Sequence, residues 1–311
     1  MDKDRTGAIS GLQCSELDDP RSFRPRSGFV DAFRERGAAD DLVEIGHDLT
    51  KLRRTDLNMV DGVSLFQQPY MQFVQHHHDR DYPLRPRIDL PAAVIPDRPF
   101  SELLRSRRSC RTFGKRPLAL AEVGALLYAA IGETARVVLA TDDGSVEVSF
   151  RSIASGGALH PTHMFVAVLK EGEPAPGIYH YDVAAHALER VKRLAAPDIK
   201  ALFAAFPIHP FVVDLERASA ICFVTTKFWR SRAKYGPRGY RYCLQEAGAA
   251  CQNLNLAAVS LGLAHVVLGG FYDDEVHACL ELDGVDHAVV TAIAVGTAPR
   301  QQEVEAHHGG L

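Results

Sequence analysis

The sequence predicts an α+β protein in which a mixed or antiparallel sheet is flanked by helices. Short apolar runs typical of strands are mixed with helical periods along the chain, and one long helical pattern lies between strands. No G-x-G-x-x-G fingerprint follows a strand and no Walker loop is present, which disfavours a nucleotide-binding fold with a parallel sheet. The order of the elements therefore favours one sheet covered by helices.

The composition is that of an ordinary soluble globular protein, and 311 residues suffice for one large domain with an extension or for two smaller domains. The formal net charge of −4 gives no reason to expect nucleic acid or an anionic membrane as a partner. No apolar run is suited to a signal peptide or long enough for a membrane span. The six cysteines are scattered without a C-x-x-C pair, so a reduced, cytoplasmic chain is expected.

Three segments are expected along the chain. Residues 1–95 are predicted to form an N-terminal extension that is partly helical and partly disordered, with helical periodicity over residues 41–74. Five prolines between residues 82 and 99 mark an extended connector. Residues 96–301 form the predicted main domain, and residues 302–311 are predicted to be a disordered tail.

The triplet His76-His77-His78 near the end of the extension invites a metal-binding interpretation. Consecutive side chains do not converge on one face of a helix or strand, and no matching carboxylate or cysteine spacing accompanies the triplet. A solvated loop is the favoured interpretation, and no metal site is predicted.

The periodicity of the main domain predicts its elements in chain order. Helices are expected at residues 100–108, 118–131, 197–206, 240–261 and 273–280, the first of them capped by Ser101. Strands are expected as a hairpin over residues 137–149 and singly at residues 164–169, 178–181, 188–192, 220–225, 265–268 and 289–295.

The longest predicted helix, residues 240–261, is the element around which the domain is organised. Its apolar residues recur at three- and four-residue steps, which predicts one buried face: Leu244, Ala247, Gly248, Cys251, Leu254, Ala258 and Leu261. Glycine inside a helix costs about 1 kcal/mol relative to alanine, so Gly248 indicates close packing. The small residues on this helix would let another helix or a second subunit approach closely.

A polar segment, residues 234–241, precedes this helix, and its glycines and proline predict a turn. Lys234 is adjacent to Tyr235, and a nearby ammonium group favours phenolate and so lowers the pKa of a tyrosine. The alternative interpretation is a solvated basic loop that caps a core helix, since such loops are common.

Two further segments carry candidate binding residues. Three arginines and a serine lie within residues 107–111, and their guanidinium and hydroxyl groups suit an anionic ligand such as phosphate, although basic clusters also often face water. The adjacent Gly156 and Gly157 would allow the backbone to lie flat against a ligand, or would form a tight turn before the next strand.

These motifs follow one another in a set order. Arg-x-Ser-x-Arg follows a short helix, Ser-Gly-Gly-Ala-Leu-x-Pro precedes a strand, Lys-Tyr-Gly-x-Arg-x-Tyr-Arg precedes a helix carrying Gln252, and Gly-Gly-Phe and Val-Gly come later. Over about residues 98–300 the chain resembles the FMN-dependent nitroreductase superfamily. Within that superfamily it resembles the SagB-type (McbC-like) dehydrogenases, which oxidise azolines in ribosomal peptides.

The resemblance implies a homodimer with FMN at the subunit interface, and it assigns roles to the matching residues. The FMN phosphate and ribityl chain would be held by Arg107, Arg108, Ser109, Arg111 and Arg300. The remaining cofactor contacts would come from Ser155, Gly156, Gly157, Gln252, Gly269 and Gly270. Substrate oxidation would involve Lys234 and Tyr235.

The function expected from this resemblance is oxidation of a thiazoline or oxazoline ring to the thiazole or oxazole. FMN would accept the hydride, and Tyr235, favoured as phenolate by Lys234, would accept the proton; water or Lys234 itself are the alternatives. The expected substrate is a peptide or carrier-bound intermediate, and a cyclodehydratase is an expected partner.

Three other functions stay open at this point. An NAD(P)H-dependent nitro or quinone reductase could have the same fold and would not need Lys234 and Tyr235. An FMN oxidase acting on another peptide- or carrier-bound amine would share every motif. A flavin-binding subunit without turnover could organise a biosynthetic complex, although such a subunit has no need of the Lys-Tyr pair.

Overall fold

The computed structural model describes residues 38–52, 82–141 and 144–299. Tertiary contacts divide the chain into two units, Met1–Leu49 and Thr50–Leu311. The described part of the first unit is helix α3, Ala38–Leu49, which lies where helical periodicity begins in the sequence. The histidine triplet, the predicted tail and Arg300 lie outside the described residues.

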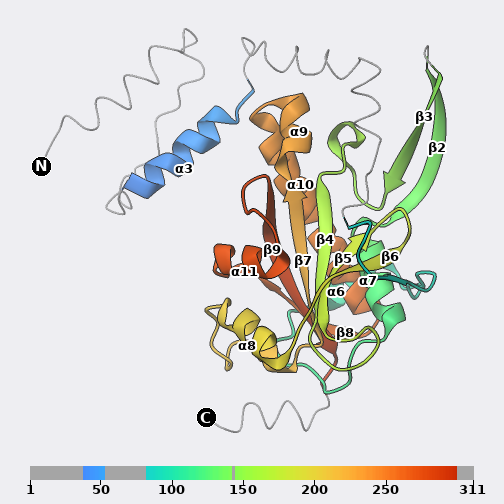
Figure 1. Ribbon diagram of the computed structural model, residues 1–311, viewed down its shortest axis with the longest axis vertical. Helices are drawn as coiled ribbons and strands as arrows, with labels where there is room; N and C mark the ends of the chain where they lie inside the picture. The colour runs from blue at the N-terminus through green and yellow to red at the C-terminus, as the bar shows by residue number, and fades with distance from the viewer. Residues whose placement is uncertain (1–37, 53–81, 142–143, 300–311) are drawn as a thin grey trace, which may run out of the picture. The chain divides into compact units, whose positions relative to one another are not determined.

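A seven-stranded sheet forms the centre of the described part of the second unit, with the strand order β1-β6-β5-β4-β7-β9-β8 (Figure 1). Every neighbouring pair in this sheet is antiparallel. The strands are β1 Arg87–Asp89, β4 Thr162–Val168, β5 Gly177–Asp182, β6 Ala187–Arg193, β7 Ala220–Lys227, β8 Leu263–Leu268 and β9 His287–Thr297. The predicted α+β class with an antiparallel sheet is confirmed.

The predicted hairpin is confirmed as well, and it is longer than expected. Strands β2, Glu133–Thr141, and β3, Gly144–Arg151, pair with each other as a separate two-stranded sheet. Alternating β-branched residues such as Val148 suit a strand with one covered face.

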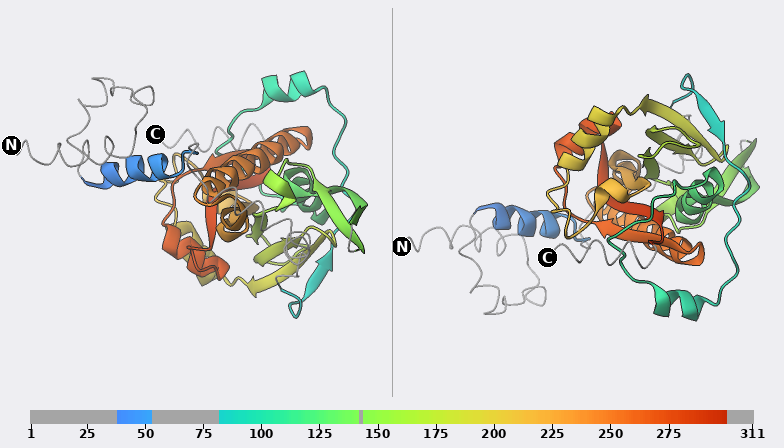
Figure 2. Two further views of the ribbon diagram at one scale, coloured as in Figure 1. Left: turned by 90° about the horizontal axis from the view of Figure 1, so that it is seen from above. Right: turned by 90° about the horizontal axis from the view of Figure 1, so that it is seen from below.

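Helices cover both faces of the large sheet (Figure 2): α7 Leu120–Ile131 and α10 Arg238–Ser260 on one face, and α8 Ala196–Ala204 and α11 Asp273–Leu280 on the other. The other described helices are α6 Phe100–Ser106, which buries no side chain, and α9 Phe228–Tyr235, with short 3-10 turns at η2 Gly156–Ala158 and η3 Leu215–Arg217. None of these described helices combines the length and the apolar composition needed to cross a bilayer.

Strand β4 shows how the sequence divides the core into two layers. Met164 and Val166 pack in one apolar cluster with α7 and α10, whereas Phe165 and Ala167 pack in a second cluster with α8 and α11. Successive side chains of a strand point to opposite faces, so a continuous apolar run builds both layers. The sheet is therefore buried between two helical layers.

Helix α10 is the long helix that the sequence predicted, but its buried face differs from the expected one. Leu244 and Gly248 are exposed, while Cys243 and Ala250 are buried. Ala247 and Leu254 were predicted to be buried and are buried in the structure. Small residues lie on every side of this helix, so the periodicity of the sequence alone leaves its rotation about its own axis ambiguous. Packing against the sheet selects a buried face that is offset by about one residue from the predicted one.

Two local predictions were wrong. Lys234 and Tyr235 do not lie in a turn; they form the last turn of α9, and the chain breaks only at Gly236 and Pro237. Helix α9 is mostly polar and buries few side chains, so its periodicity is weak. Ser101 lies inside α6 rather than capping it, because the helix begins directly after Pro99.

The proline-rich connector also contains an element that the sequence did not reveal. Strand β1 within it pairs with β6, Ile88 opposite Leu188. A three-residue edge strand is too short for its alternation to be recognised in the sequence.

Replacing Gly239 with alanine should destabilise the α9–α10 junction, because a Cβ there would lie 2.5 Å from the Ser231 carbonyl oxygen. Overpacking of this kind lowers the free energy of unfolding by about 1–3 kcal/mol. Gly248→Ala is the matched control in the same helix: its Cβ would meet no atom of its own chain within 4 Å, so no overpacking within the chain is expected. Urea denaturation measures both values, and a Gly239→Ala protein as stable as wild type would contradict this packing.

Candidate functional site

The Lys-Tyr pair at the end of α9 lies against the glycine loop that precedes β4. A Cβ placed on Gly157 would lie 2.6 Å from Tyr235 Oη and 2.9 Å from Lys234 Nζ. A Cβ placed on Gly156 would lie 3.7 Å from the ring of Tyr235. Two motifs that are far apart in the sequence therefore meet, and only glycine leaves room for the pair at position 157.

The glycine loop has an unusual backbone. Gly157, Ala158 and His160 have φ angles of 65°, 53° and 47°, in the left-handed region. Non-glycine residues pay about 1–3 kcal/mol for such conformations, which persist only where surrounding contacts enforce them. Here the His160 backbone N–H donates to Ser155 Oγ at 2.9 Å, and Arg230 Nε donates to the Leu159 carbonyl oxygen at 2.7 Å. The loop is therefore held in a preorganised shape.

Glu246 on α10 anchors this loop, and the sequence analysis missed it. One carboxylate oxygen, Oε1, accepts hydrogen bonds from Ser155 Oγ at 3.0 Å and from the Gly156 backbone N–H at 3.1 Å. Only 5% of Glu246 is exposed, and the other oxygen, Oε2, has no hydrogen-bond partner among the described residues. The sequence does contain a signal for Glu246: it is a carboxylate that falls between Cys243 and Ala250, at the helical spacing of the buried face.

Burial raises the pKa of Glu246 to about 7, because the charged form is poorly solvated. The hydrogen bonds from Gly156 and Ser155, and the charge of Arg151, offset part of this rise. The carboxyl group therefore titrates near neutral pH beside the glycine loop.

The electrostatics of the Lys-Tyr pair differ from the expectation. Burial lowers the pKa of Lys234, and burial together with Tyr242 and Glu246 raises the pKa of Tyr235. The prediction that Lys234 lowers the pKa of Tyr235 is therefore wrong: desolvation of the phenolate outweighs the nearby ammonium group. A neutral phenol is favoured at Tyr235, and Lys234 loses its proton more easily than an exposed lysine.

The predicted phosphate-binding residues form a second group along the edge strand β8. The Cys110 backbone N–H donates to the His265 carbonyl oxygen at 2.8 Å, which holds residues 107–111 beside this strand. Arg108, Ser109 and Arg111 are exposed, while the guanidinium of Arg108 turns back to carbonyl oxygens at the end of α6. The segment is thus cationic and largely open to solvent.

His265 is a further residue that the sequence analysis missed in this group. It is 2% exposed, and the backbone of Leu263 is a hydrogen-bond partner of its ring. Burial lowers its pKa and outweighs this hydrogen bond, which raises the pKa, while the charge of Arg107 lowers it further. Gly269 and Gly270 follow β8 and are exposed, with no atom within 4 Å of a Cβ at either position.

The two groups lie on different parts of the sheet. The glycine loop leads into β4, and β7 and β9 separate β4 from β8. At the usual strand spacing, β4 and β8 lie about 14 Å apart.

Gln252 is exposed on α10, and its neighbour Asn253 donates to the Ser152 carbonyl oxygen at 3.2 Å, just before the glycine loop.

The residues present fit FMN in chemical type. The arginines and serine of residues 107–111 supply donors for a phosphate, and the glycine loop has no Cβ at Gly156 and Gly157 to keep a planar ring away from its backbone. The buried Oε2 of Glu246, which has no hydrogen-bond partner among the described residues, is a polar atom that a ligand could satisfy. No group of three or more His, Cys, Asp or Glu side chains within the described ranges is placed to hold a metal ion.

Comparison with known proteins identifies the family of this chain. The model of the nitroreductase family matches residues 104–297. The chain belongs to the nitroreductase family. A relative in Methanocaldococcus jannaschii, the nitroreductase-like protein MJ1384, is 31% identical over 189 residues, which cover 59% of this chain and 84% of the relative.

Two further relatives of this nitroreductase-family chain are named as processing proteins. The trifolitoxin-processing protein TfxB of Rhizobium leguminosarum bv. trifolii is 28% identical over 257 residues, covering 77% of this chain and 66% of TfxB. The microcin B17-processing protein McbC of Escherichia coli is 33% identical over 152 residues, covering 46% of this chain and 51% of McbC. The chain thus matches only part of each, and the resemblance to McbC-like members of the superfamily is confirmed.

A solved structure with the same fold is a nitroreductase-like protein of Anabaena variabilis. It has a TM-score of 0.59 and 21% sequence identity, and the match covers 81% of this chain and 45% of that protein. Membership of the family makes the chain an oxidoreductase of the flavin type.

Gly157→Ala should displace the Lys-Tyr pair, because the new Cβ would overlap Tyr235 Oη and because φ of 65° disfavours an L side chain. We expect a loss of about 1–3 kcal/mol in the free energy of unfolding and a changed near-UV circular dichroism spectrum from the tyrosines. Gly156→Ala is the control, since its Cβ would make only ordinary contacts of 3.5 and 3.7 Å. Equal effects of the two substitutions would show that the close approach at Gly157 does not exist.

Glu246→Gln should change how stability depends on pH. The pKa of Glu246 is raised by folding, so its stabilising contribution is complete below the unfolded pKa near ~4.3 and is lost as pH rises through about 7. Glutamine imitates the protonated acid and does not titrate. From pH 5 to pH 8 the free energy of unfolding of the wild type should therefore fall by about 3 kcal/mol relative to that of the variant. Urea denaturation at both pH values measures this. Glu216→Gln, at an exposed carboxylate, should leave the pH dependence unchanged; an unchanged profile for Glu246→Gln would refute the raised pKa.

Proposed function

We propose that the chain is an FMN-dependent dehydrogenase that oxidises thiazoline or oxazoline rings in a peptide or related intermediate to thiazoles or oxazoles. The observation that carries this proposal is the placement of Lys234 and Tyr235 against Gly157, where a flat ligand would meet both side chains. The relatives that process trifolitoxin and microcin B17 support a peptide as the substrate.

Aromatisation of an azoline removes one hydride and one proton. When bound, FMN would supply the hydride acceptor. The chain must supply the base, and Lys234 suits this role because burial lowers its pKa and so increases the fraction of neutral amine. Tyr235 keeps its proton and can donate a hydrogen bond that orients the substrate ring. This assignment replaces the phenolate expected from the sequence.

The basic segment and the loop after β8 would hold the cofactor. Arg107, Ser109 and Arg111 supply donors for the phosphate, and exposed Gly269 and Gly270 leave room for the cofactor to approach the backbone. Arg300 and Gln252 stay proposed contacts from the resemblance. The glycine loop would lie against the flavin ring, with its shape maintained by Glu246.

We also propose a homodimer in which each cofactor site takes one group of residues from each chain. The separation of the glycine loop from β8 within one chain supports this arrangement. So does the exposed side of α10, where Leu244 is 39% exposed beside the small residue Gly248. If a second chain packs there, Gly248→Ala weakens the dimer. A cyclodehydratase that forms the azoline is the proposed biosynthetic partner.

The second candidate is an NAD(P)H-dependent nitro or quinone reductase of the same fold, and the similarity to MJ1384 favours it. A reductase would use the same cofactor residues without needing the Lys-Tyr pair. Anaerobic addition of NADPH to the purified flavoprotein separates the two functions: rapid bleaching of the flavin indicates the reductase, and flavin that resists bleaching indicates the dehydrogenase.

Lys234→Ala should lower kcat on a thiazoline peptide by about 10²–10⁴-fold, because it removes the base, while the flavin spectrum is retained. Tyr235→Phe should mainly raise KM, since it removes a hydrogen bond. In wild type the rate should rise with pH as Lys234 deprotonates, below the usual lysine pKa, and this rise should be absent in Lys234→Ala. Mass spectrometry follows the loss of two hydrogens, and Lys200→Ala on the exposed face of α8 is the control. Normal turnover by flavin-loaded Lys234→Ala would refute this role.

A further inference from the structure

Tyr242 has no part in the mechanism above, although it lies where the glycine loop meets the Lys-Tyr pair. It belongs to α10 and stands four residues before Glu246, so the two side chains share one face of the helix. Glu246 reaches the loop through hydrogen bonds from Ser155 and Gly156, and Tyr242 reaches it through its ring. Helix α10 therefore contacts the loop at two points, one helical turn apart.

The ring of Tyr242 packs against both neighbours. A Cβ placed on Gly156 would lie 3.5 Å from Tyr242 Cδ2 and 3.9 Å from Tyr242 Cγ, so the ring covers this glycine with room for little more than a methyl group. The ring centroids of Tyr235 and Tyr242 lie 5.0 Å apart, with an angle of 82° between the ring planes. Such an edge-to-face pair is favourable, because the positive edge of one ring meets the negative face of the other. Tyr242 therefore joins Tyr235 to the backbone of the loop.

Ring contacts, rather than hydrogen bonds, fix the position of Tyr235. Among the residues that the structure describes, none is a hydrogen-bond partner of its hydroxyl group. The ring instead meets the ring of Tyr242 and the ammonium group of Lys234, which lies 5.7 Å from its centroid. The hydroxyl oxygen nevertheless lies close to Gly157, where a Cβ would be only 2.6 Å away. The direction of the hydroxyl group therefore depends on what holds the ring.

Arg238 supports the ring of Tyr242 in turn. Its Cζ lies 5.9 Å from the ring centroid, within the range of a cation–π contact. The same guanidinium group donates a long hydrogen bond, 3.4 Å, to the Thr50 carbonyl oxygen, and Arg241 Nε donates to Thr50 Oγ1 at 2.7 Å. These bonds tie the start of α10 to a residue far earlier in the chain, and the first of them holds Arg238 beside Tyr242.

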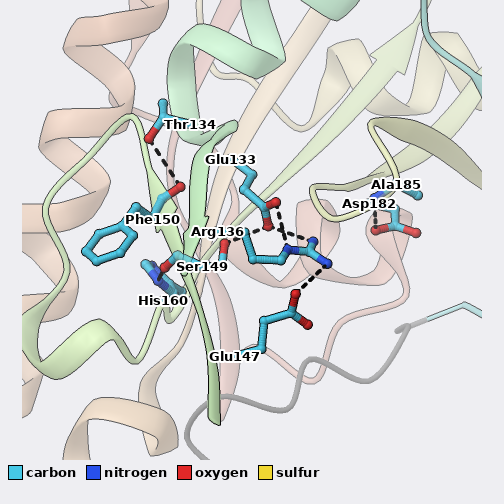
Figure 3. A network of polar contacts seen from close by, with 9 residues as sticks. All are labelled: Glu133, Thr134, Arg136, Glu147, Ser149, Phe150, His160, Asp182 and Ala185. Carbon is cyan, nitrogen blue, oxygen red and sulfur yellow. Dashed lines mark hydrogen bonds and ion pairs between the residues drawn. The ribbon is translucent and has the colours of Figure 1, made fainter. Parts of the chain in front are cut away.

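The glycine loop itself is also held by the β2–β3 hairpin. His160 Nε2 donates to the Ser149 carbonyl oxygen at 2.9 Å (Figure 3). Within the hairpin, Glu133 accepts two hydrogen bonds from Arg136, at 2.9 and 3.0 Å, and one from Ser149 Oγ at 2.7 Å (Figure 3). The loop is thus fixed by the hairpin as well as by Glu246, so it offers a rigid surface to the side chains of α9.

We propose that Tyr242 is a positioning residue: its ring holds the Tyr235 hydroxyl group at Gly157, and Arg238 keeps that ring in place. A constellation of reacting groups works only when supporting side chains hold it to within about 0.5 Å. The ring of Tyr242 gives this support, and its hydroxyl group is not needed. The effect on turnover rests on the proposed function, whereas the contact between the two tyrosines does not.

The first test measures the contact itself, through a double-mutant cycle in urea denaturation of the full-length, FMN-loaded protein. Tyr235→Leu and Tyr242→Leu should be non-additive: the unfolding equilibrium constants should show a coupling of about two- to tenfold, which corresponds to the worth of one aromatic pair. The control cycle combines Tyr235→Leu with Tyr240→Leu and should be additive, because Tyr240 stacks on Phe228 instead, with ring centroids 5.0 Å apart.

The second test measures turnover of a thiazoline peptide. Tyr242→Leu should raise KM by about two- to tenfold, since a displaced Tyr235 loses its hydrogen bond to the substrate. Tyr242→Phe should keep the wild-type KM, because it keeps the ring. In a Tyr235→Phe background, Tyr242→Leu should raise KM no further, because the hydroxyl group that it positions is already absent. Tyr240→Leu is again the control.

Arg238→Gln tests the same network without changing a ring, and thermal unfolding checks that every variant is folded. This substitution should raise KM by a smaller factor than Tyr242→Leu does, and it should add nothing in a Tyr235→Phe background. Where Tyr242→Leu does not fold, the cycle of Arg238→Gln with Tyr235→Phe replaces it, and additive effects on KM there contradict the network.

Three results would overturn the proposal: additive effects of Tyr235→Leu and Tyr242→Leu on stability; equal damage by Tyr242→Phe and Tyr242→Leu; or a further rise of KM when Tyr242→Leu is added to Tyr235→Phe. A failure of the proposed function looks different, because the stability cycle would still show coupling in a protein that leaves thiazoline peptides unchanged.

Discussion

The site depends on one interaction, the pair of hydrogen bonds from Ser155 and Gly156 to the buried carboxylate of Glu246. These bonds tie a loop with three left-handed residues to the longest helix of the domain. Without such an anchor, the strained backbone would relax toward ordinary turn geometry. Because the loop is held, Gly157 stays close enough to α9 for Lys234 and Tyr235 to lie directly against it. Burial of the Glu246 carboxylate costs free energy, and the geometry of the site depends on the hydrogen bonds that this buried group accepts.

Desolvation, rather than the pairing of charges, sets the protonation states around this anchor. The pKa of Glu246 and that of Tyr235 rise, and the pKa of Lys234 falls, with burial as the largest cause in each case. All three shifts favour the neutral form. Hydrogen bonds in such a partly desolvated site are stronger than hydrogen bonds exposed to water, which helps to hold its geometry.

Helix α9 links the glycine loop to the Lys-Tyr pair. Its first turn carries Arg230, which supports the loop by donating to the Leu159 carbonyl oxygen, and its last turn carries Lys234 and Tyr235. One short helix therefore positions the two side chains and also supports the backbone they lie against.

The sequence by itself determined the class of the fold and most of its elements. Strand alternation and the long helical period are local properties, so β4 to β9, the hairpin and α10 were predictable within a few residues. The order of the polar motifs was sufficient to group Gly156 and Gly157 with Lys234 and Tyr235. Tertiary structure alone decided the rotation of α10, since small residues on every side leave its phase open until it packs on the sheet. It also decided the burial of Glu246 and the direction of the pKa shifts, because each arises from groups that only the folded chain brings together.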